Sequence, residues 1–203
     1  MPRPLQGAKH RASNAIKLLG QPRGRRRWRS VAGQVPAWDD RNSLIASLVP
    51  RGSAILDVGC GAQTLRTHLD AQSRYVPCDC VPSAPGVIKI DLNRDVWPKV
   101  DGAFDYVVMS GVLEYLKAPG AALRRVHDFA PAVVTSYQDL RSEISKVTRR
   151  MHHGWVNHLS LPEILSVFEE AGWLVEAQVG WRDSYVFVLR SVNDTRPAGQ
   201  SVG

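Results

Sequence analysis

The segment ILDVGCGAQ, residues 55–63, constrains the fold more than any other part of the chain. The run AILDV (54–58) is apolar, contains β-branched residues and is bounded by glycines, which indicates a buried strand. Gly59 and Gly61 then fall in a turn, where glycine permits positive φ and lets a ligand approach the backbone closely. Asp57 stands near the end of the same strand. The segment therefore predicts a strand whose carboxyl end belongs to a ligand site.

Strand and helix patterns alternate from about residue 40 onward. The expected helices are 41–49, 62–71, 120–130 and 160–173, and the expected strands are 54–58, 74–78, 86–90, 104–110, 132–137, 174–180 and 184–190. Such alternation predicts an α/β fold with a parallel sheet covered by helices on both faces. The last two strands are joined by a short turn, which cannot connect parallel strands, so one of them must run antiparallel.

The length of 203 residues suits one domain with a substantial core. We expect a basic N-terminal extension over 1–36, partly disordered or helical, a domain over 37–191 and a disordered tail over 192–203. No apolar run approaches the roughly 18–20 residues that span a bilayer. The three cysteines, Cys60, Cys78 and Cys80, lack CxxC spacing, which argues against a disulfide framework or zinc site and favours a reducing compartment. The expected location is cytoplasmic.

The net charge of +7 comes from the N-terminal extension. Residues 1–30 contain nine of the 26 Lys and Arg residues and no acid, so the remainder has 17 basic against 19 acidic residues, or −2. An arginine run around Trp28 is compatible with contact to phosphates or to an anionic membrane surface, and equally with a solvated extension. An Arg-rich, acid-poor start also resembles an organellar transit peptide.

Two further acids stand at the ends of the next two predicted strands. Asp79 follows Asp57 by 22 residues, close to the spacing at which an acid holds ribose hydroxyls in nucleotide-binding sheets. Asp91 ends the third strand, where a carboxylate can accept a hydrogen bond from an adenine amino group. Asp57 is placed to accept one from a cationic amino group. Three carboxylates at successive strand ends predict a nucleotide-like ligand.

With these motifs the chain resembles the class I S-adenosylmethionine-dependent methyltransferases, in particular their small-molecule, methyltransferase-11-like members. The segments ILDVGCG, YVPCD, VIKIDLN and FDYVVMSGVLEYL resemble the first four motifs of that family in order, and the resemblance extends over about residues 38–190. It implies a Rossmann-like, doubly wound, seven-stranded sheet with the last strand antiparallel. It also implies S-adenosyl-L-methionine as cofactor, held by Asp57, Gly59, Gly61, Gln63, Asp79, Cys80, Asp91, Leu92, Ser110 and Gly111.

One position departs from the family pattern, because Gln63 stands where a third glycine is frequent. That third glycine mainly tightens helix packing. We therefore expect Gln63 to begin the next helix at little cost and its amide to reach the cofactor carboxylate. A nicotinamide-dependent oxidoreductase is the competing class, but its G-x-G-x-x-G fingerprint fails at Thr64.

Candidate catalytic groups gather after the fifth strand. Methyl transfer needs a general base only where the nucleophile must lose a proton. The candidates for such a base are Tyr137, His153 and His158, and histidine titrates near neutral pH. They flank an arginine-rich, presumed helical piece over 141–150 that is expected to lead into a substrate lid. Glu114 matches a family position frequently occupied by Glu or His. No metal site is expected.

The expected function is methyl transfer to a small-molecule, lipid or glycan acceptor, with O-methylation slightly preferred. The chain has no Asn-Pro-Pro-Tyr-type motif, which some nucleic-acid and protein amide methyltransferases use. An RNA methyltransferase that uses the arginine-rich extension is the alternative enzyme, with nucleic acid a less favoured partner. A non-catalytic protein that binds the cofactor is the third reading.

Overall fold

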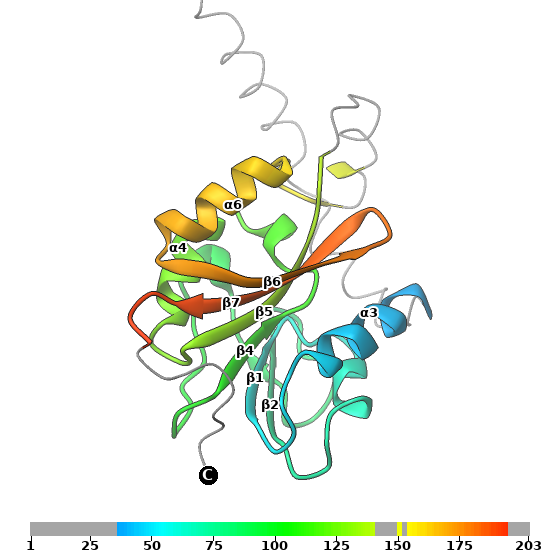
Figure 1. Ribbon diagram of the computed structural model, residues 1–203. Coiled ribbons are helices and arrows are strands. Elements are labelled where there is room, and N and C mark those ends of the chain that lie inside the picture. Colours follow the sequence, from blue (N-terminus) through cyan, green and yellow to red (C-terminus); the bar gives the residue numbers. More distant parts are fainter. Residues whose placement is uncertain (1–35, 141–149, 152–153, 195–203) are drawn as a thin grey trace, which may run out of the picture.

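The computed structural model describes residues 36–140, 150–151 and 154–194, and its centre is one seven-stranded sheet (Figure 1). The strand order is β3-β2-β1-β4-β5-β7-β6. The strands are β1 (Ala54–Val58), β2 (Arg74–Asp79), β3 (Ile88–Lys89), β4 (Tyr106–Met109), β5 (Ala132–Gln138), β6 (Trp173–Trp181) and β7 (Ser184–Ser191). Three of the segments predicted from the sequence lie mostly outside the described residues, namely the extension 1–36, the arginine-rich piece 141–150 and the tail 192–203.

The direction of the strands follows the prediction. β1 pairs in parallel with β2 and β4, β2 with β3, and β4 with β5. β7 lies between β5 and β6 and is antiparallel to both. Only Arg182 and Asp183 separate β6 from β7, and Arg182 adopts a left-handed φ of 52° that closes the tight turn. The predicted doubly wound sheet with one reversed strand is confirmed.

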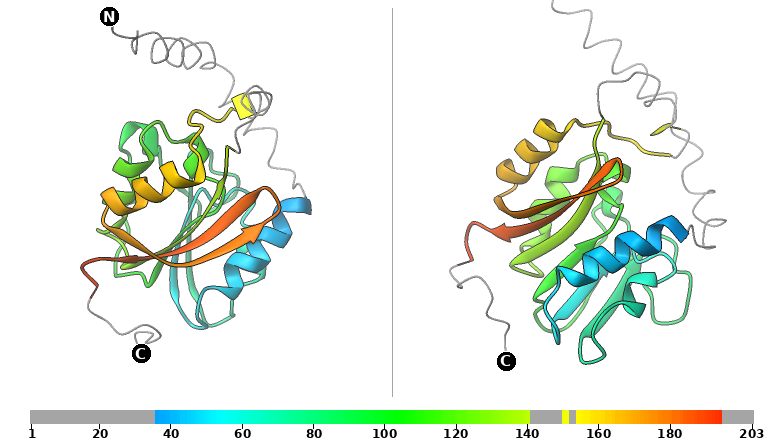
Figure 2. Two further views of the ribbon diagram at one scale, coloured as in Figure 1. Left: turned by 45° about the horizontal axis from the view of Figure 1, so that its top comes forward. Right: turned by 45° about the vertical axis from the view of Figure 1, so that its right-hand side comes forward.

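Helices cover both faces of the sheet (Figure 2). Helix α3 (Pro36–Ser47) lies on one face, and α4 (Pro119–Val126) and α6 (Leu161–Glu170) lie on the other. Alternate residues of each strand serve the two faces: Ile55 belongs to the apolar cluster beneath α3, and Leu56 to the one beneath α4 and α6. This two-sided burial is what the continuous apolar runs of the central strands indicated.

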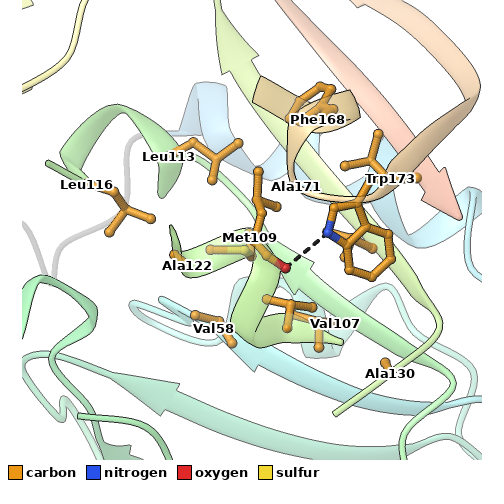
Figure 3. Packing of buried hydrophobic residues seen from close by; sticks show 14 of the residues in the cluster. Val58, Val107, Met109, Leu113, Leu116, Ala122, Ala130, Phe168, Ala171 and Trp173 are labelled. Carbon is orange, nitrogen blue, oxygen red and sulfur yellow. Dashed lines mark hydrogen bonds between the residues drawn. The ribbon is translucent and has the colours of Figure 1, made fainter. Parts of the chain in front are cut away.

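Trp173 belongs to the larger cluster (Figure 3). Its side chain is 1% exposed, and its indole N–H donates a 3.0 Å hydrogen bond to the carbonyl of Leu123 on α4. Helix α6 begins at the predicted capping box, where the backbone N–H and the hydroxyl of Ser160 both donate to Glu163 at 2.7 Å. These contacts fix α4 and α6 against the sheet.

The helix predicted over 62–71 is wrong. The structure has only a four-residue 3₁₀ helix there, η1 (Thr64–Thr67), with turns on either side. Leu65 is its one buried residue, at 2% exposure, so the segment presents too little apolar surface to hold a longer helix on the sheet. Two further short 3₁₀ helices, η2 (Leu92–Arg94) and η3 (Leu113–Tyr115), follow β3 and β4.

Candidate cofactor and acceptor site

Asp57 is held at the end of β1 by a tyrosine of the neighbouring strand. The hydroxyl of Tyr75 donates a 2.5 Å hydrogen bond to Asp57 Oδ2, and Asp57 is only 2% exposed. Burial raises the pKa of Asp57 to about 7, although the hydrogen bond from Tyr75 lowers it; Asp79 adds a smaller rise. The group therefore changes charge near neutral pH, and an adjoining cation would favour its ionised form.

The glycine turn after β1 is tied to the end of β2. The backbone N–H groups of Gly59 and Cys60 donate to the carbonyl of Cys78 at 2.8 and 3.1 Å. The N–H of Gly61 donates a 2.9 Å bond to Asp79 Oδ2. Val81 N–H donates to the other oxygen of Asp79 at 2.8 Å. A carboxylate has about four acceptor positions, so Asp79 keeps capacity for hydroxyl donors of a ligand.

The turn needs its glycines for two different reasons. Gly59 has φ 82°, and a Cβ there would stand 2.5 Å from Cγ2 of Val112. Gly61 has φ 52° with open space where a Cβ would be. Gln63 has φ 60°, in the left-handed region that glycine adopts without strain. The expectation that a glutamine costs little there is wrong, because Gln63 does not begin a helix with helical dihedrals but precedes η1 in this conformation.

The remaining predicted cofactor residues lie along the same edge. Asp91 follows β3, where its backbone pairs with Val96, and its carboxylate lies 3.6 Å from Arg94 Nε. Leu92 begins η2 and packs against the larger apolar cluster. Cys80, directly after β2, is exposed.

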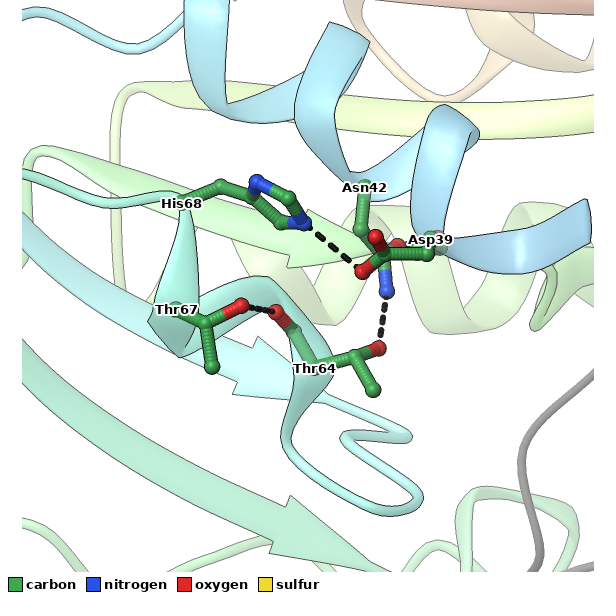
Figure 4. Close-up of polar contacts among 6 residues, drawn as sticks. Asp39, Asn42, Thr64, Thr67 and His68 are labelled. Atoms are coloured by element: carbon green, nitrogen blue, oxygen red, sulfur yellow. Dashed lines mark hydrogen bonds and ion pairs between the residues drawn. The ribbon is translucent and has the colours of Figure 1, made fainter. Parts of the chain in front are cut away.

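Asn42 connects the two motif turns, a contact that the sequence reasoning missed. It accepts a 2.9 Å hydrogen bond from the hydroxyl of Ser110, just after β4. Its amide donates a 2.5 Å bond to Thr64 Oγ1 in η1 (Figure 4). Gly111, which follows Ser110, donates its N–H to Ser136 Oγ at 2.8 Å. Asn42 stands three residues before buried Ile45 on α3 and is itself 7% exposed, so a polar residue at apolar spacing was the available signal.

Tyr137, a predicted catalytic residue, is buried at the end of β5. Its hydroxyl donates a 2.6 Å bond to Asn157 Oδ1 and accepts one from Leu159 N–H at 2.8 Å. Burial raises the pKa of Tyr137 to about 12. The hydroxyl therefore stays protonated near neutral pH and ties residues 157–159 to β5. This brings partly buried His158 to the same strand end, whereas His153 lies outside the described residues.

Glu114 lies on η3, within the same carboxyl edge, and is 4% exposed. Its Oε1 accepts a 2.9 Å bond from the N–H of Gln138. Its Oε2 is buried and has no hydrogen-bond partner in the described part of the chain. Burial raises the pKa of Glu114, and backbone hydrogen bonds and two arginines, Arg41 and Arg150, oppose the rise.

The donor set fits the cofactor that the sequence implied. A buried carboxylate at Asp57 suits an ammonium group, a two-oxygen acceptor at Asp79 suits paired hydroxyls, and the bare backbone at Gly61 allows close approach. Over residues 36–140, 150–151 and 154–194, no group of three His, Cys, Asp or Glu side chains is arranged to hold a metal ion. Within the same residues no helix is long and apolar enough to cross a membrane.

Solved structures with this fold include proteins whose titles name methyltransferases. The pyocyanin biosynthetic protein PhzM superposes with a TM-score of 0.56 at 18% identity, over 74% of this chain and 54% of its own. NcsB1 is an O-methyltransferase of neocarzinostatin biosynthesis, in complex with S-adenosylmethionine and 2-hydroxy-5-methyl naphthoic acid. It superposes with a TM-score of 0.56 at 17% identity, over 72% of this chain and 52% of its own. A SAM-dependent methyltransferase from Aquifex aeolicus superposes with a TM-score of 0.54 at 17% identity, over 71% of this chain and 85% of its own. The chain spans about half the length of the first two proteins.

No curated protein matches the sequence. A family model described as a methyltransferase domain matches residues 26–178, about three quarters of the chain. The match includes the glycine turn, the three strand-end acids and the segment around Tyr137 described above. Together with the 3-2-1-4-5-7-6 sheet, it confirms the resemblance found in the sequence. The chain belongs to the methyltransferase domain family and has the fold of the class I S-adenosylmethionine-dependent methyltransferases.

Proposed function

We propose that this protein transfers a methyl group from S-adenosyl-L-methionine to an oxygen of a small-molecule acceptor. One observation carries the proposal: Asp57, Asp79 and the Gly59–Gly61 turn meet at the carboxyl edge of the sheet, where β1 adjoins both β2 and β4. In open α/β sheets ligands bind at this switch point. The titles of PhzM and NcsB1 support a small-molecule acceptor, since both act in the biosynthesis of small metabolites.

When bound, the cofactor supplies an electrophilic methyl group, which leaves sulfur as the acceptor oxygen bonds to it and the hydroxyl proton passes to a base. The chain's own residues orient the two partners: Asp57 and Asp79 hold the donor side, and Ser110 and Gly111 line its boundary with the acceptor. Orientation alone supplies a large part of such catalysis, up to about 7–11 kcal/mol.

The base is best assigned to Glu114 among the described candidates. Its buried Oε2 has no hydrogen-bond partner in the described part of the chain, and burial raises its pKa, which makes the carboxylate a stronger base. Tyr137, by contrast, uses its hydroxyl to hold Asn157 and Leu159. We therefore give Tyr137 a positioning role. His158 at the same strand end and His153 remain alternative bases.

The decisive experiment has a binding arm and a turnover arm. S-adenosylhomocysteine should raise the melting temperature of the purified protein, and Asp79→Ala should remove the shift. Lys99→Ala is the matched control, because Lys99 lies outside the strand ends. Transfer of labelled methyl groups to fractionated metabolites should then identify acceptors. Absence of any shift would refute cofactor binding, whereas a shift without transfer to any fraction would favour a binding protein. Transfer only to RNA or glycan fractions would replace the small-molecule assignment.

A further inference from the structure

One partly buried arginine and one buried arginine act electrostatically on one buried glutamate beside the proposed acceptor position. Arg41 comes from α3, Glu114 from η3 and Arg150 from the chain after β5. Arg150 is 3% exposed and Glu114 4% exposed. The guanidinium of Arg41 packs over Gly111, since a Cβ there would lie 2.8 Å from Arg41 Nη1. Arg150 donates a 2.7 Å bond to the carbonyl of Gln138, whose N–H donates to Glu114. We name Arg41, Glu114 and Arg150 the two-arginine cluster.

The charge of the cluster is not balanced. Two guanidinium groups stand against one carboxylate, and burial raises the pKa of that carboxylate. The acids that precede Arg41 along α3 are engaged elsewhere: Asp39 lies 2.7 Å from His68 and Asp40 3.0 Å from Arg182. A buried cation without a full counter-charge is costly, so the site favours an additional anion.

Three polar atoms of the cluster have no hydrogen bond within the part of the chain that the structure describes. Arg41 Nε, Arg150 Nε and Glu114 Oε2 are each buried with no partner among the described residues. A buried polar atom left unpaired costs about 1–3 kcal/mol, and folded proteins keep few of them. The three unpaired atoms belong to one cluster, which indicates that a ligand supplies their hydrogen-bond partners.

Aromatic rings hold both guanidinium groups in place. The Arg41 guanidinium carbon lies 6.0 Å from the centre of the Trp38 ring and 5.8 Å from that of Trp181. The guanidinium of Arg150 lies 4.7 Å from the Trp155 ring. Rings beside guanidinium faces orient these groups without neutralising their charge. The arrangement is a preorganised, net positive subsite with aromatic walls.

We propose that Arg41 and Arg150 bind an anionic group, a carboxylate or a phosphate, of the methyl acceptor, so that the enzyme's substrate is an acidic small molecule. Guanidinium groups match the geometry of both anions. The inference rests on the proposed function, because it names the substrate class of that same site. Glu114 then faces the hydroxyl side of the acceptor, and its charge opposes the anion that the arginines attract.

The test compares acids with their neutral counterparts. Hydroxybenzoates and hydroxynaphthoates, each with its amide and its phosphate-ester counterpart, are added to protein saturated with S-adenosylhomocysteine, and the melting temperature is measured. Acids should bind at least about tenfold more tightly than amides. Arg41→Met should reduce this preference to near unity. Arg51→Met is the matched control, since Arg51 is 92% exposed and pairs only loosely with Asp70, at 3.6 Å.

Glu114→Gln separates charge from packing, because it keeps the shape and removes the opposing charge. The variant should bind the acid more tightly than wild type does and bind the amide equally well, and its kcat should be lower. Equal binding of acids and amides, an unchanged preference in Arg41→Met, or no binding by any compound of the set would overturn the inference. If S-adenosylhomocysteine binds and only neutral acceptors are methylated, the proposed function is supported and the inference of an acidic substrate is wrong. If the cofactor product itself does not bind, the proposed function falls first.

Discussion

The hydroxyl of Tyr75 and the carboxylate of Asp57 form a partly buried 2.5 Å hydrogen bond between adjacent strands, two residues before Gly59 of the glycine turn. Burial and the neighbouring carboxylate raise the pKa of Tyr75, so the tyrosine remains the donor. The bond holds Asp57 in one orientation and partly offsets the cost of its charge. If Asp57 binds the cofactor as we propose, stability and cofactor binding depend on the same titrating group.

The first prediction concerns pH. The pKa of Asp57 is about 7 in the folded protein and about 3.9 in an unfolded chain. Since the folded value is raised, the stabilisation from protonated Asp57 is fully present below the unfolded pKa and is lost as pH rises through about 7. The melting temperature of Asp57→Asn should therefore exceed that of wild type by an amount that grows from about pH 4 to about pH 7 and stays level above that. A gap that is constant with pH would contradict the assignment.

The affinity for the cofactor product should rise over the pH range in which the stability of the wild-type protein falls. The ammonium group of S-adenosylhomocysteine favours ionised Asp57, so its affinity for wild type rises through about pH 7. Asp57→Asn should bind weakly at every pH and lose this dependence. Calorimetric titration at several pH values measures both. Wild-type affinity that does not vary across that window would show that Asp57 does not face the ammonium group.

The second prediction is that Gln63→Gly stabilises the protein. Gln63 has a φ of 60°, which costs a residue with a Cβ about 1–2 kcal/mol relative to glycine. Part of the gain is offset because glycine has more freedom in the unfolded chain. A net gain of up to about 1 kcal/mol in the free energy of unfolding is expected from denaturant titration. Gln63→Ala, which keeps a Cβ, is the control and should give no gain.

The third prediction concerns the contact between Gly59 and Val112. A methyl group on Gly59 would stand 2.5 Å from Cγ2 of Val112, and its backbone has φ 82°. Gly59→Ala should therefore destabilise the protein by about 1–3 kcal/mol and shift the turn that contacts the cofactor. The double variant Gly59→Ala, Val112→Ala should recover only the steric part. Complete recovery would mean that the dihedral angle costs nothing.

The fourth prediction separates positioning from catalysis at Tyr137. Tyr137→Phe leaves Leu159 N–H and Asn157 Oδ1 without the hydroxyl, so the protein should lose about 1–3 kcal/mol of stability. As a positioning residue, it should change kcat and KM together and leave the pH profile of kcat unaltered. Disappearance of a titration step from that profile would instead make Tyr137 the base. Methyl-transfer assays at a series of pH values measure both kcat and KM.

The strands and the reversal of one of them were predictable from the sequence, because each central strand is an apolar run and only a short turn joins the last two strands. Asp57 and Asp79 could be placed for the same reason. The two-arginine cluster could not be predicted. Arg150 closes an arginine-rich segment that is typical of a solvated face, and only the packing of the chain on β5 buries it. Arg41 likewise lies against Gly111, which is 70 residues further along the chain, and local periodicity does not encode that contact.

The antiparallel insertion of β7 has a consequence for how the protein matures. β5 pairs with β7 along seven residue pairs, from Ala132 with Arg190 to Gln138 with Ser184. Until residues 184–191 leave the ribosome, the strand that carries Tyr137 has one open side, exposed to any other extended segment. The proposed acceptor half of the site would thus assemble late in synthesis, after β1 and β2, which carry the proposed cofactor half, can already pair.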